Sequence, residues 1–297
     1  MAALLRLFRP YEYVLIAYFL YTSVLALVLP LKPPVPAVVL VMNAIVLGGM
    51  GFLAYADSLR RRELLAIVRD WYAPPLLLLA YREMGWFAQP HTSTALEDAW
   101  VVWDRLLLNE WGLRAVVEAL GPVGPGLLEI AYVFVYAMAP LAMAAFYLCK
   151  CRERVPAFLF NFTLAVLAVY ALFPYFPSEP PWYNYPGADF PTYETIFRRF
   201  NRAMLESQGI HTSVFPSAHV SGAMAAAFAV MRLLPEKKWL GWAWLVLAIL
   251  IAVATVYCRY HYAADAVAGF VIAVGATGLT VWWEKRSGAG VGRRPRV

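Results

Sequence analysis

Two apolar runs joined by a short charged turn decide the fold, and both lie within residues 216–265, PSAHVSGAMAAAFAVMRLLPEKKWLGWAWLVLAILIAVATVYCRYHYAAD. The runs cover about 217–234 and 239–257, and a helix of roughly 20 apolar residues crosses a bilayer. The turn at Pro235–Lys238 is so short that the two helices must be antiparallel neighbours. The start of the first helix and the end of the second therefore lie at the same membrane level.

The rest of the chain continues this pattern. Of its 297 residues, 62% are hydrophobic and 15% are charged, whereas a soluble domain is about half apolar and a quarter charged. This composition excludes a soluble globular enzyme and a disordered chain. The other predicted spans are about 11–29, 36–55, 72–87, 125–148, 155–173 and 263–283. We predict an all-α, polytopic integral membrane helical bundle with six to eight spans, most simply eight.

The predicted span at 72–87 is the weakest of the set. Pro74 and Pro75 interrupt it, and Leu76–Ala80 is its only continuous apolar stretch. A kinked or re-entrant helix is therefore an alternative to a straight span.

The positive charges predict the orientation. With the N-terminus inside and eight crossings, the 25 Lys and Arg residues divide into 17 on the inner side and 8 on the outer side. This is the bias expected of cytoplasmic loops. Both termini are therefore predicted to be cytoplasmic, in the plasma membrane or a Golgi-type endomembrane. The net charge of +6 then reflects inner loops rather than a nucleic-acid partner. Nothing in the sequence indicates an oligomeric state.

We divide the chain by these features. The predicted parts are two N-terminal spans (1–60), a short span followed by interfacial helices (61–124), the main membrane bundle (125–284) and a basic cytoplasmic tail (285–297).

Two long outer segments lie between the predicted spans. In residues 88–124, Trp and Leu recur at near-helical spacing, which predicts amphipathic helices at the membrane interface; they are Trp100, Trp103, Leu107 and Trp111. Residues 174–216 are rich in Pro, Tyr and Phe and show little periodicity. A loop of that length and aromatic content predicts a functional cover.

Titratable residues gather where the last three spans meet. The chain has four histidines, all on the predicted outer side, and they are His91, His211, His219 and His261. We interpret His91 and His211 as amphipathic interface residues. His219 opens one span, and Arg259, His261 and Asp265 follow the next. The antiparallel pairing brings these four residues to one level, and ionisable residues inside spans are costly and mark function by default.

The spacing within this cluster favours phosphoryl transfer. His261 and Asp265 are at i and i+4, so the carboxylate can fix the tautomer of the ring. Pro216 is suited to begin a helix whose first turn contains Ser217, and a helix N-terminus favours a phosphate. Arg259 offers forked donors to phosphate oxygens. A nucleophile, an acid/base and two anion supports around one point indicate phosphoryl transfer.

Zinc is the alternative for this cluster. His219, His261 and Asp265 are possible ligands, but the Arg259 charge would repel a dication and no close-spaced ligand pair exists. We expect no metal and no other cofactor.

At these residues the sequence resembles the type 2 phosphatidic acid phosphatase superfamily, and within it the inositol phosphorylceramide synthase branch. The resemblance covers roughly residues 125–283. It rests on three segments, which are Phe173–Tyr183 (FPYFPSEPPWY), Phe215–His219 with Ser221 and Gly222, and His261–Tyr262 with Asp265 and Gly269.

The resemblance implies a six-helix phosphatase-like core in the C-terminal half and a role for each motif residue. His261 would be the nucleophile that becomes phosphohistidine, and Asp265 would orient it. His219 would protonate the leaving group and then activate the acceptor.

Two motif positions depart from the superfamily. Residues 165–182 contain neither Lys nor Arg where a Lys…Arg-Pro motif is expected, and Ala254-Thr255 replace a Ser-Arg pair. Other residues must therefore bind the substrate. We name Arg259 first, then Arg82 and Arg198 as phosphate-binding cations, with the helix start at Ser217. Trp182 and Tyr183, within Pro180–Tyr183, are predicted to form a wall or lid, or alternatively an interfacial anchor.

These features predict a membrane enzyme whose partners are lipid substrates. It would cleave a lipid phosphoester or phosphodiester and pass the phospho-headgroup, inositol phosphate in the synthase version, to a lipid alcohol or to water. The motifs and the aromatic segment 174–216 favour transfer over hydrolysis, because acceptor choice depends on the exclusion of water. The alternatives are a simple lipid phosphatase of the polyprenyl or phosphatidic acid type, and a non-enzymatic transporter or scaffold.

Overall fold

The computed structural model describes residues 7–60, 62–88, 93–187, 189–210 and 212–287. His91, His211 and most of the predicted basic tail lie outside these residues, so their interpretation stays a prediction.

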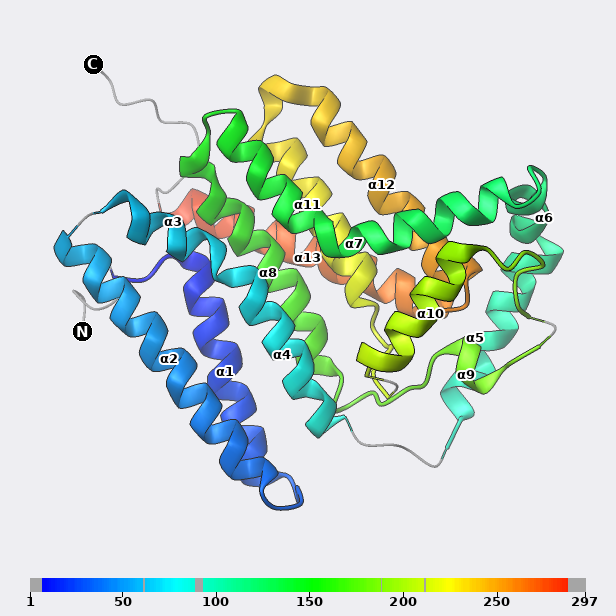
Figure 1. Cartoon of the computed structure of the whole chain (residues 1–297), viewed down its shortest axis with the longest axis horizontal. Coiled ribbons are helices and arrows are strands. Elements are labelled where there is room, and N and C mark those ends of the chain that lie inside the picture. The colour runs from blue at the N-terminus through cyan, green and yellow to red at the C-terminus, as the bar shows by residue number, and fades with distance from the viewer. Residues whose placement is uncertain (1–6, 61, 89–92, 188, 211, 288–297) are drawn as a thin grey trace.

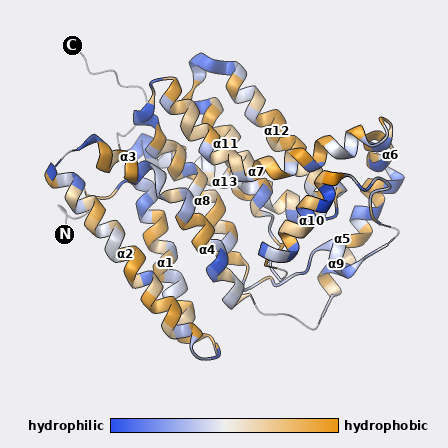
Figure 2. Cartoon of the chain, viewed as in Figure 1, coloured by the Kyte–Doolittle hydropathy of each residue, from blue (hydrophilic) through white to orange (hydrophobic). Residues whose placement is uncertain are grey.

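The described chain is a bundle of long apolar helices (Figures 1 and 2). The helices that correspond to predicted spans are α1 (Pro10–Val28), α2 (Val35–Arg60), α4 (Ala73–Phe87), α7 (Val123–Leu148), α8 (Val155–Leu172), α11 (Ala218–Leu233), α12 (Lys238–Tyr257) and α13 (Ala263–Ser287). Within the part of the chain that the structure describes, seven helical stretches are long and apolar enough to cross a membrane, and α11 is a shorter apolar helix among them. Among those same residues, extended pairing is limited to one isolated bridge from Ser178 to Ser213. The predicted all-α membrane bundle is confirmed.

The weakest predicted span is a kinked helix. The helix α3 (Glu63–Trp71) ends at Tyr72, and α4 begins at once with Pro74 and Pro75 in its first turn. Proline is tolerated there because first-turn N–H groups have no intrahelical partner. The helix α4 then continues beside α1 and α8 without reversing, so the kinked alternative describes this segment and the re-entrant one does not.

The helix α11 lies at the centre of the bundle and packs against α7, α8, α12 and α13. Its small residues, such as Ala225 and Ala226, are fully buried and allow helix axes to approach closely. The closest approach is from α13, where a Cβ added to Gly269 would lie 2.4 Å from the carbonyl oxygen of Ser217. This contact fixes the start of α11 against the first turns of α13.

A layer of shorter helices covers one end of the bundle (Figure 1). They are α5 (Ala95–Arg105), the π-helical turn Leu106–Glu110, α6 (Leu113–Glu118), α9 (Pro181–Asn184) and α10 (Ile196–Gln208). The helices predicted within 88–124 are present as α5 and α6. The segment 174–216, for which no helix was predicted, contains α10, a 13-residue amphipathic helix that Thr195 caps by accepting a hydrogen bond from the Arg198 N–H.

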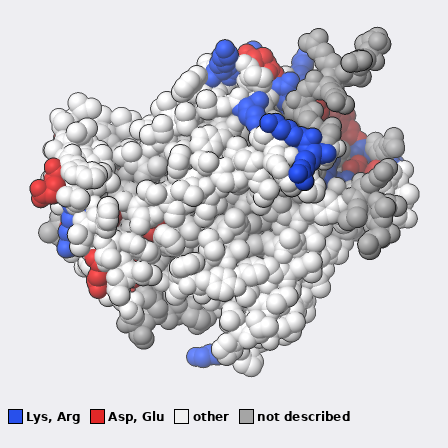
Figure 3. Space-filling view, turned by 180° about the vertical axis from the view of Figure 1, so that it is seen from behind, with Lys and Arg blue, Asp and Glu red and all other residues white. Residues whose placement is uncertain are grey.

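Charged groups gather at the ends of the bundle. Figure 3 shows one broad face without charge, with Lys and Arg side chains concentrated at one end of it. At the end away from α9 and α10, the N-terminal helices are joined to the bundle by buried ion pairs. Arg69 binds Glu12 at 2.5 Å, and Asp70 accepts hydrogen bonds from Tyr147 at 2.5 Å and from Arg152 at 2.8 Å. An uncharged face between charged ends is the pattern of an integral membrane protein.

Candidate active site

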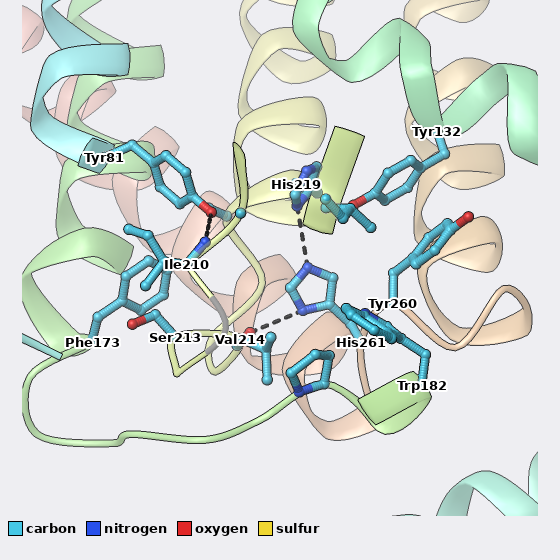
Figure 4. Close-up of a pocket in the computed structure, with 14 residues that line it drawn as sticks. Tyr81, Tyr132, Phe173, Trp182, Ile210, Ser213, Val214, His219, Tyr260 and His261 are labelled. Carbon is cyan, nitrogen blue, oxygen red and sulfur yellow. Dashed lines mark hydrogen bonds between the residues drawn. The ribbon is translucent and has the colours of Figure 1, made fainter. Parts of the chain in front are cut away.

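Two histidine rings meet in the covered end of the bundle (Figure 4). His219 lies in the first turn of α11, and His261 lies in the short connection between α12 and α13. The His219 Nδ1 and His261 Nε2 atoms are 3.2 Å apart. The structure therefore brings together the two rings that the antiparallel pairing of α11 and α12 predicted to be close.

The hydrogen bonds around His261 set its tautomer. Its Nδ1 lies 2.9 Å from the carbonyl oxygen of Val214 and 3.2 Å from Oδ2 of Asp265. A carbonyl can only accept, so we assign the proton to Nδ1, which leaves the Nε2 lone pair free. The same Asp265 oxygen accepts the Tyr262 N–H at 2.9 Å, which holds the carboxylate in place.

This assignment extends to His219. Because His261 Nε2 is an acceptor, His219 Nδ1 must be its donor, and His219 Nε2 then accepts from the Tyr136 hydroxyl at 3.4 Å. The result is one directional chain of hydrogen bonds from Tyr136 to Asp265.

His261 is held as a neutral base. Its ring is 5% exposed, and burial lowers the pKa of His261 to about 4. A neutral imidazole with a free Nε2 lone pair is a competent nucleophile.

Tyrosine rings enclose His219. Tyr132 stacks on it with ring centroids 4.9 Å apart, Tyr136 meets it edge-on at 5.8 Å, and Tyr260 packs on Tyr132 at 4.4 Å. Sequence reasoning missed these residues. Tyr132 and Tyr136 do share the i, i+4 spacing of one face of α7, which could have indicated a paired role.

A pocket opens in front of the two rings, and Figure 4 shows how its lining converges on His261. The lining is aromatic or apolar apart from the histidines and Ser213, and no Lys, Arg, Asp or Glu is part of it. The lining residues are Tyr81, Tyr132, Phe173, Pro180, Trp182, Leu205, Gly209, Ile210, Ser213, Val214, Ala218, His219, Tyr260 and His261.

The three arginines named from the sequence lie outside this lining. Arg259 is fully buried and binds Asp104 at 2.5 Å. Arg198 binds the buried Glu129 at 3.3 Å. Arg82 is hydrogen-bonded to Gln208. The structure therefore does not bring any of these three guanidinium groups into contact with the histidine pair.

The remaining predicted residues divide between the pocket and its surroundings. Trp182 lines the pocket, whereas Tyr183 is 56% exposed and does not. Ser217 caps α11, because its hydroxyl accepts the Val220 N–H at 3.3 Å, and its own N–H donates to the Asp265 carbonyl at 3.0 Å. Ser217 thus positions the start of α11, and its N–H is already used.

Asp104 is another residue that the sequence analysis missed. Besides Arg259, it accepts the N–H of Ala263 at 2.8 Å. It therefore holds both sides of the connection that carries His261. Its partners are more than 150 positions away along the chain, so no local pattern could have identified it.

The described residues contain no group of three or more His, Cys, Asp or Glu side chains arranged to hold a metal ion. The pair His219–His261 with Asp265 is instead a linear hydrogen-bonded series, with the first ring donating to the second.

Comparison with known proteins gives one match. The family model described as the PAP2 superfamily matches residues 100–279, which run from α5 to α13 and include Asp104, both paired histidines and Asp265. No curated protein and no solved structure matches the chain.

Proposed function

Because the chain belongs to the PAP2 superfamily, a family of phosphatase-type phosphoesterases, we propose that it cleaves a lipid phosphoester or phosphodiester through a phosphohistidine on His261. The observation that carries this proposal is the 3.2 Å approach of His219 to a His261 ring whose Nδ1 faces Val214 and Asp265. That arrangement leaves the Nε2 lone pair of His261 unprotonated, with the second imidazole as its partner until a phosphoryl group displaces it.

In the first step, Nε2 of His261 attacks the phosphorus atom. A phosphorus–nitrogen bond forms while the bond from phosphorus to the leaving oxygen breaks. That oxygen takes a proton from His219, which is neutral in the substrate-free structure and takes up this proton when the anionic substrate binds. Asp265 and the Val214 carbonyl stabilise the positive charge that develops on His261 through its Nδ1–H.

In the second step, His219 removes a proton from the acceptor hydroxyl. The acceptor oxygen attacks phosphorus, the phosphorus–nitrogen bond breaks, and His261 is regenerated. A lipid alcohol as acceptor gives a phosphotransferase, and water gives a phosphatase.

The lining of the pocket supports a lipid as substrate. Aromatic and aliphatic side chains form most of its wall, and apolar walls bury the stem of an amphiphile rather than a hydrated sugar phosphate. The cover made by α9 and α10 supports transfer to a lipid alcohol, because a covered site limits the entry of water. The inositol phosphorylceramide synthase-like branch is the version of this activity that the segment Phe173–Tyr183 resembles.

The orientation is part of the proposal. The basic inner loops favour cytoplasmic termini, which puts the histidine pair at the extracytoplasmic rim. A lipid of the outer leaflet then reaches the pocket without crossing the membrane.

The test is an assay of the purified full chain in lipid nanodiscs. Incubation with native lipid extract, followed by mass spectrometry, is expected to show loss of one phospholipid class and gain of a new phospholipid or a free phosphate. Vanadate, which mimics the trigonal-bipyramidal phosphoryl group, is expected to block the reaction, and a chelator is expected to leave it unchanged.

His261→Ala is expected to abolish turnover, by at least about a thousandfold, because the covalent step has no nucleophile. The control is Tyr55→Phe, a change at an exposed ring on α2 outside the pocket, which should keep wild-type activity. Wild-type turnover in His261→Ala with the same elution profile in size-exclusion chromatography would remove the proposed mechanism.

A further inference from the structure

The pocket needs a positive charge that its lining does not contain. A phosphoryl group carries negative charge through the reaction, and enzymes stabilise it with fixed cations or N–H donors. Neither Lys nor Arg is among the residues that form the pocket wall. The candidates are therefore Lys or Arg side chains that contact the pocket wall from outside and could reach a bound phosphoryl group.

The helix α10 carries two arginines on the face that includes its pocket-lining residues. Leu205 and Gly209 both line the pocket; Arg202 precedes them by three and seven positions, and Arg198 precedes Leu205 by seven. The Arg202 guanidinium lies over the indole ring of Trp182, 5.8 Å from the ring centroid, and over the ring of Phe190 at 5.7 Å. Trp182 is itself part of the pocket wall, so Arg202 packs against one residue of that wall.

The bonds of Arg202 leave it available. Its Nε is buried and has no hydrogen-bond partner. Its ion pair is with Glu206 of the same helix, at 3.6 Å and with a side chain 54% exposed. Surface pairs of this kind contribute little and are easily exchanged for a better acceptor.

The neighbouring arginines are bound in a different way. Arg198 and Arg259 pair with Glu129 and Asp104, and all four side chains are at most 4% exposed. Withdrawing a guanidinium from such a pair would leave a buried carboxylate uncompensated, which is strongly unfavourable. Both also have N–H groups without a partner, at Arg198 Nη2 and at Arg259 Nε and Nη2, but their buried carboxylate pairs hold each guanidinium in place. The ion pair of Arg202 is partly exposed, so its guanidinium is the one of these three that can turn toward a ligand.

We infer that Arg202 binds the non-bridging oxygens of the substrate's phosphoryl group while its guanidinium stays in contact with the Trp182 indole ring. This rests on the proposed function, because it assigns a substrate-binding residue to the same site. An arginine on an aromatic face can present Nε and one Nη as a forked pair of donors. The loop helix α10 would then supply the charge that the missing Lys…Arg-Pro motif does not.

The experiment compares three variants of the full chain in nanodiscs: Arg202→Ala, Arg202→Lys and Arg199→Ala. Arg199 is the matched control, because it lies on the same helix and is exposed on another face. Two quantities are measured, kcat/KM for the lipid substrate found in native extract and the affinity for inorganic vanadate by titration calorimetry.

Arg202→Ala is expected to lower kcat/KM and vanadate affinity together, each by about 10- to 100-fold, the effect of losing a charge-assisted hydrogen bond. Arg202→Lys should recover part of both losses, since it restores the charge without the fork. Arg199→Ala should match the wild type in both.

Vanadate binding separates the two proposals. A wild-type chain that binds vanadate through Arg202 but turns over no lipid phosphate would overturn the proposed function and leave the anion site standing. Conversely, an active wild type whose kcat/KM and vanadate affinity are unchanged in Arg202→Ala would overturn the inference alone. A loss of activity in Arg202→Ala with unchanged vanadate affinity and no recovery in Arg202→Lys would also overturn it, since it would mark a packing role.

Discussion

At the scale of single residues, the arrangement of protons around the two histidines decides what the site can do. Val214 offers a carbonyl, so the donor in that bond is the His261 ring, and every other donor in the series follows from this one constraint. The free lone pair of His261 is met by an N–H of His219 in the absence of substrate. A phosphoryl group must therefore displace that contact when it enters.

The burial of His261 predicts the pH dependence of the covalent step. Its pKa is lowered from 6.5 to about 4, so the ring stays unprotonated down to that pH and is lost as a nucleophile only below it. On the acid side, the rate of phosphohistidine formation in a single turnover should therefore fall with a midpoint near pH 4. Rapid quenching in alkali, where phosphohistidine is stable, measures it. A midpoint near 6.5 would show that the ring is solvated rather than buried.

Tyr136→Phe removes the hydroxyl that donates to His219 Nε2 at 3.4 Å. The His219 ring then loses the bond that selects its tautomer, and we expect turnover to fall by roughly 3- to 10-fold, the effect of one neutral hydrogen bond. Spectra of ¹⁵N-histidine-labelled protein report the tautomer directly, since the chain has only four histidines.

Tyr11→Phe is the control for this change. Tyr11 is a buried tyrosine on α1 whose hydroxyl donates to the carbonyl oxygen of Arg69 at 2.5 Å, at the end of the bundle away from α9 and α10. It should alter neither turnover nor the histidine spectrum. An unchanged His219 resonance in Tyr136→Phe would mean that the 3.4 Å contact does not set the tautomer.

At the scale of helices, the crossing of α11 and α13 sets the register of the site. Ser217 and Asp265 are joined through their backbones at 3.0 Å, and this is the level at which Gly269 lets the two helices touch. One turn of slippage of α13 along α11 would move Asp265 and the connection that carries His261 away from His219.

Gly269→Ala tests that crossing. A Cβ at this position would lie 2.4 Å from the backbone oxygen of Ser217, which cannot swing aside as a side chain can. We expect the folded state to lose roughly 1–3 kcal/mol and most of its activity, because the helices must separate to fit the methyl group. Thermal unfolding followed by fluorescence-detected size-exclusion chromatography measures the first effect.

The matched control lies two turns further along the same helix. A Cβ added to Gly275 would have nothing within 4 Å, so Gly275→Ala changes the same helix without a clash. It should leave unfolding and turnover as they are. Equal thermal shifts in the two variants would show that helix propensity, not the crossing, causes the effect.

The short helices that cover the site, such as α10, are harder to predict from the sequence than the membrane spans. The helix α10 has no continuous apolar run and follows a stretch rich in Pro and Tyr. Its inward face carries Arg198 and Asn201, which bind Glu129 on α7 rather than a hydrophobic surface. Its apolar residues, such as Ile196 and Phe200, recur at helical spacing but are exposed, so the hydrophobic period indicates the outward face and not the packed one.

At the scale of the whole molecule, the fold was predictable where the bilayer imposes it. A long apolar run such as 239–257 must form a helix in lipid, because only a helix satisfies its backbone hydrogen bonds within the segment. The short turn at Pro235–Lys238 then made α11 and α12 antiparallel, which was enough to pair His219 with His261. The partners of the arginines could not be found in this way. Arg259 meets Asp104 across 155 positions, and charge alone does not say which carboxylate a guanidinium will meet.

The part of the pocket wall that comes from α4 shows that the catalytic unit extends beyond the segment that matches the family. Tyr81 lines the pocket, and its hydroxyl accepts the N–H of Ile210 at 2.8 Å, yet it precedes the segment shared with the family by 19 positions. A fragment cut to the shared segment would keep every reactive group and lose one side of the chamber, together with the support of the loop leading into α11. The reactive residues thus lie within the segment that matches the family, whereas part of the pocket wall lies before it in the same chain.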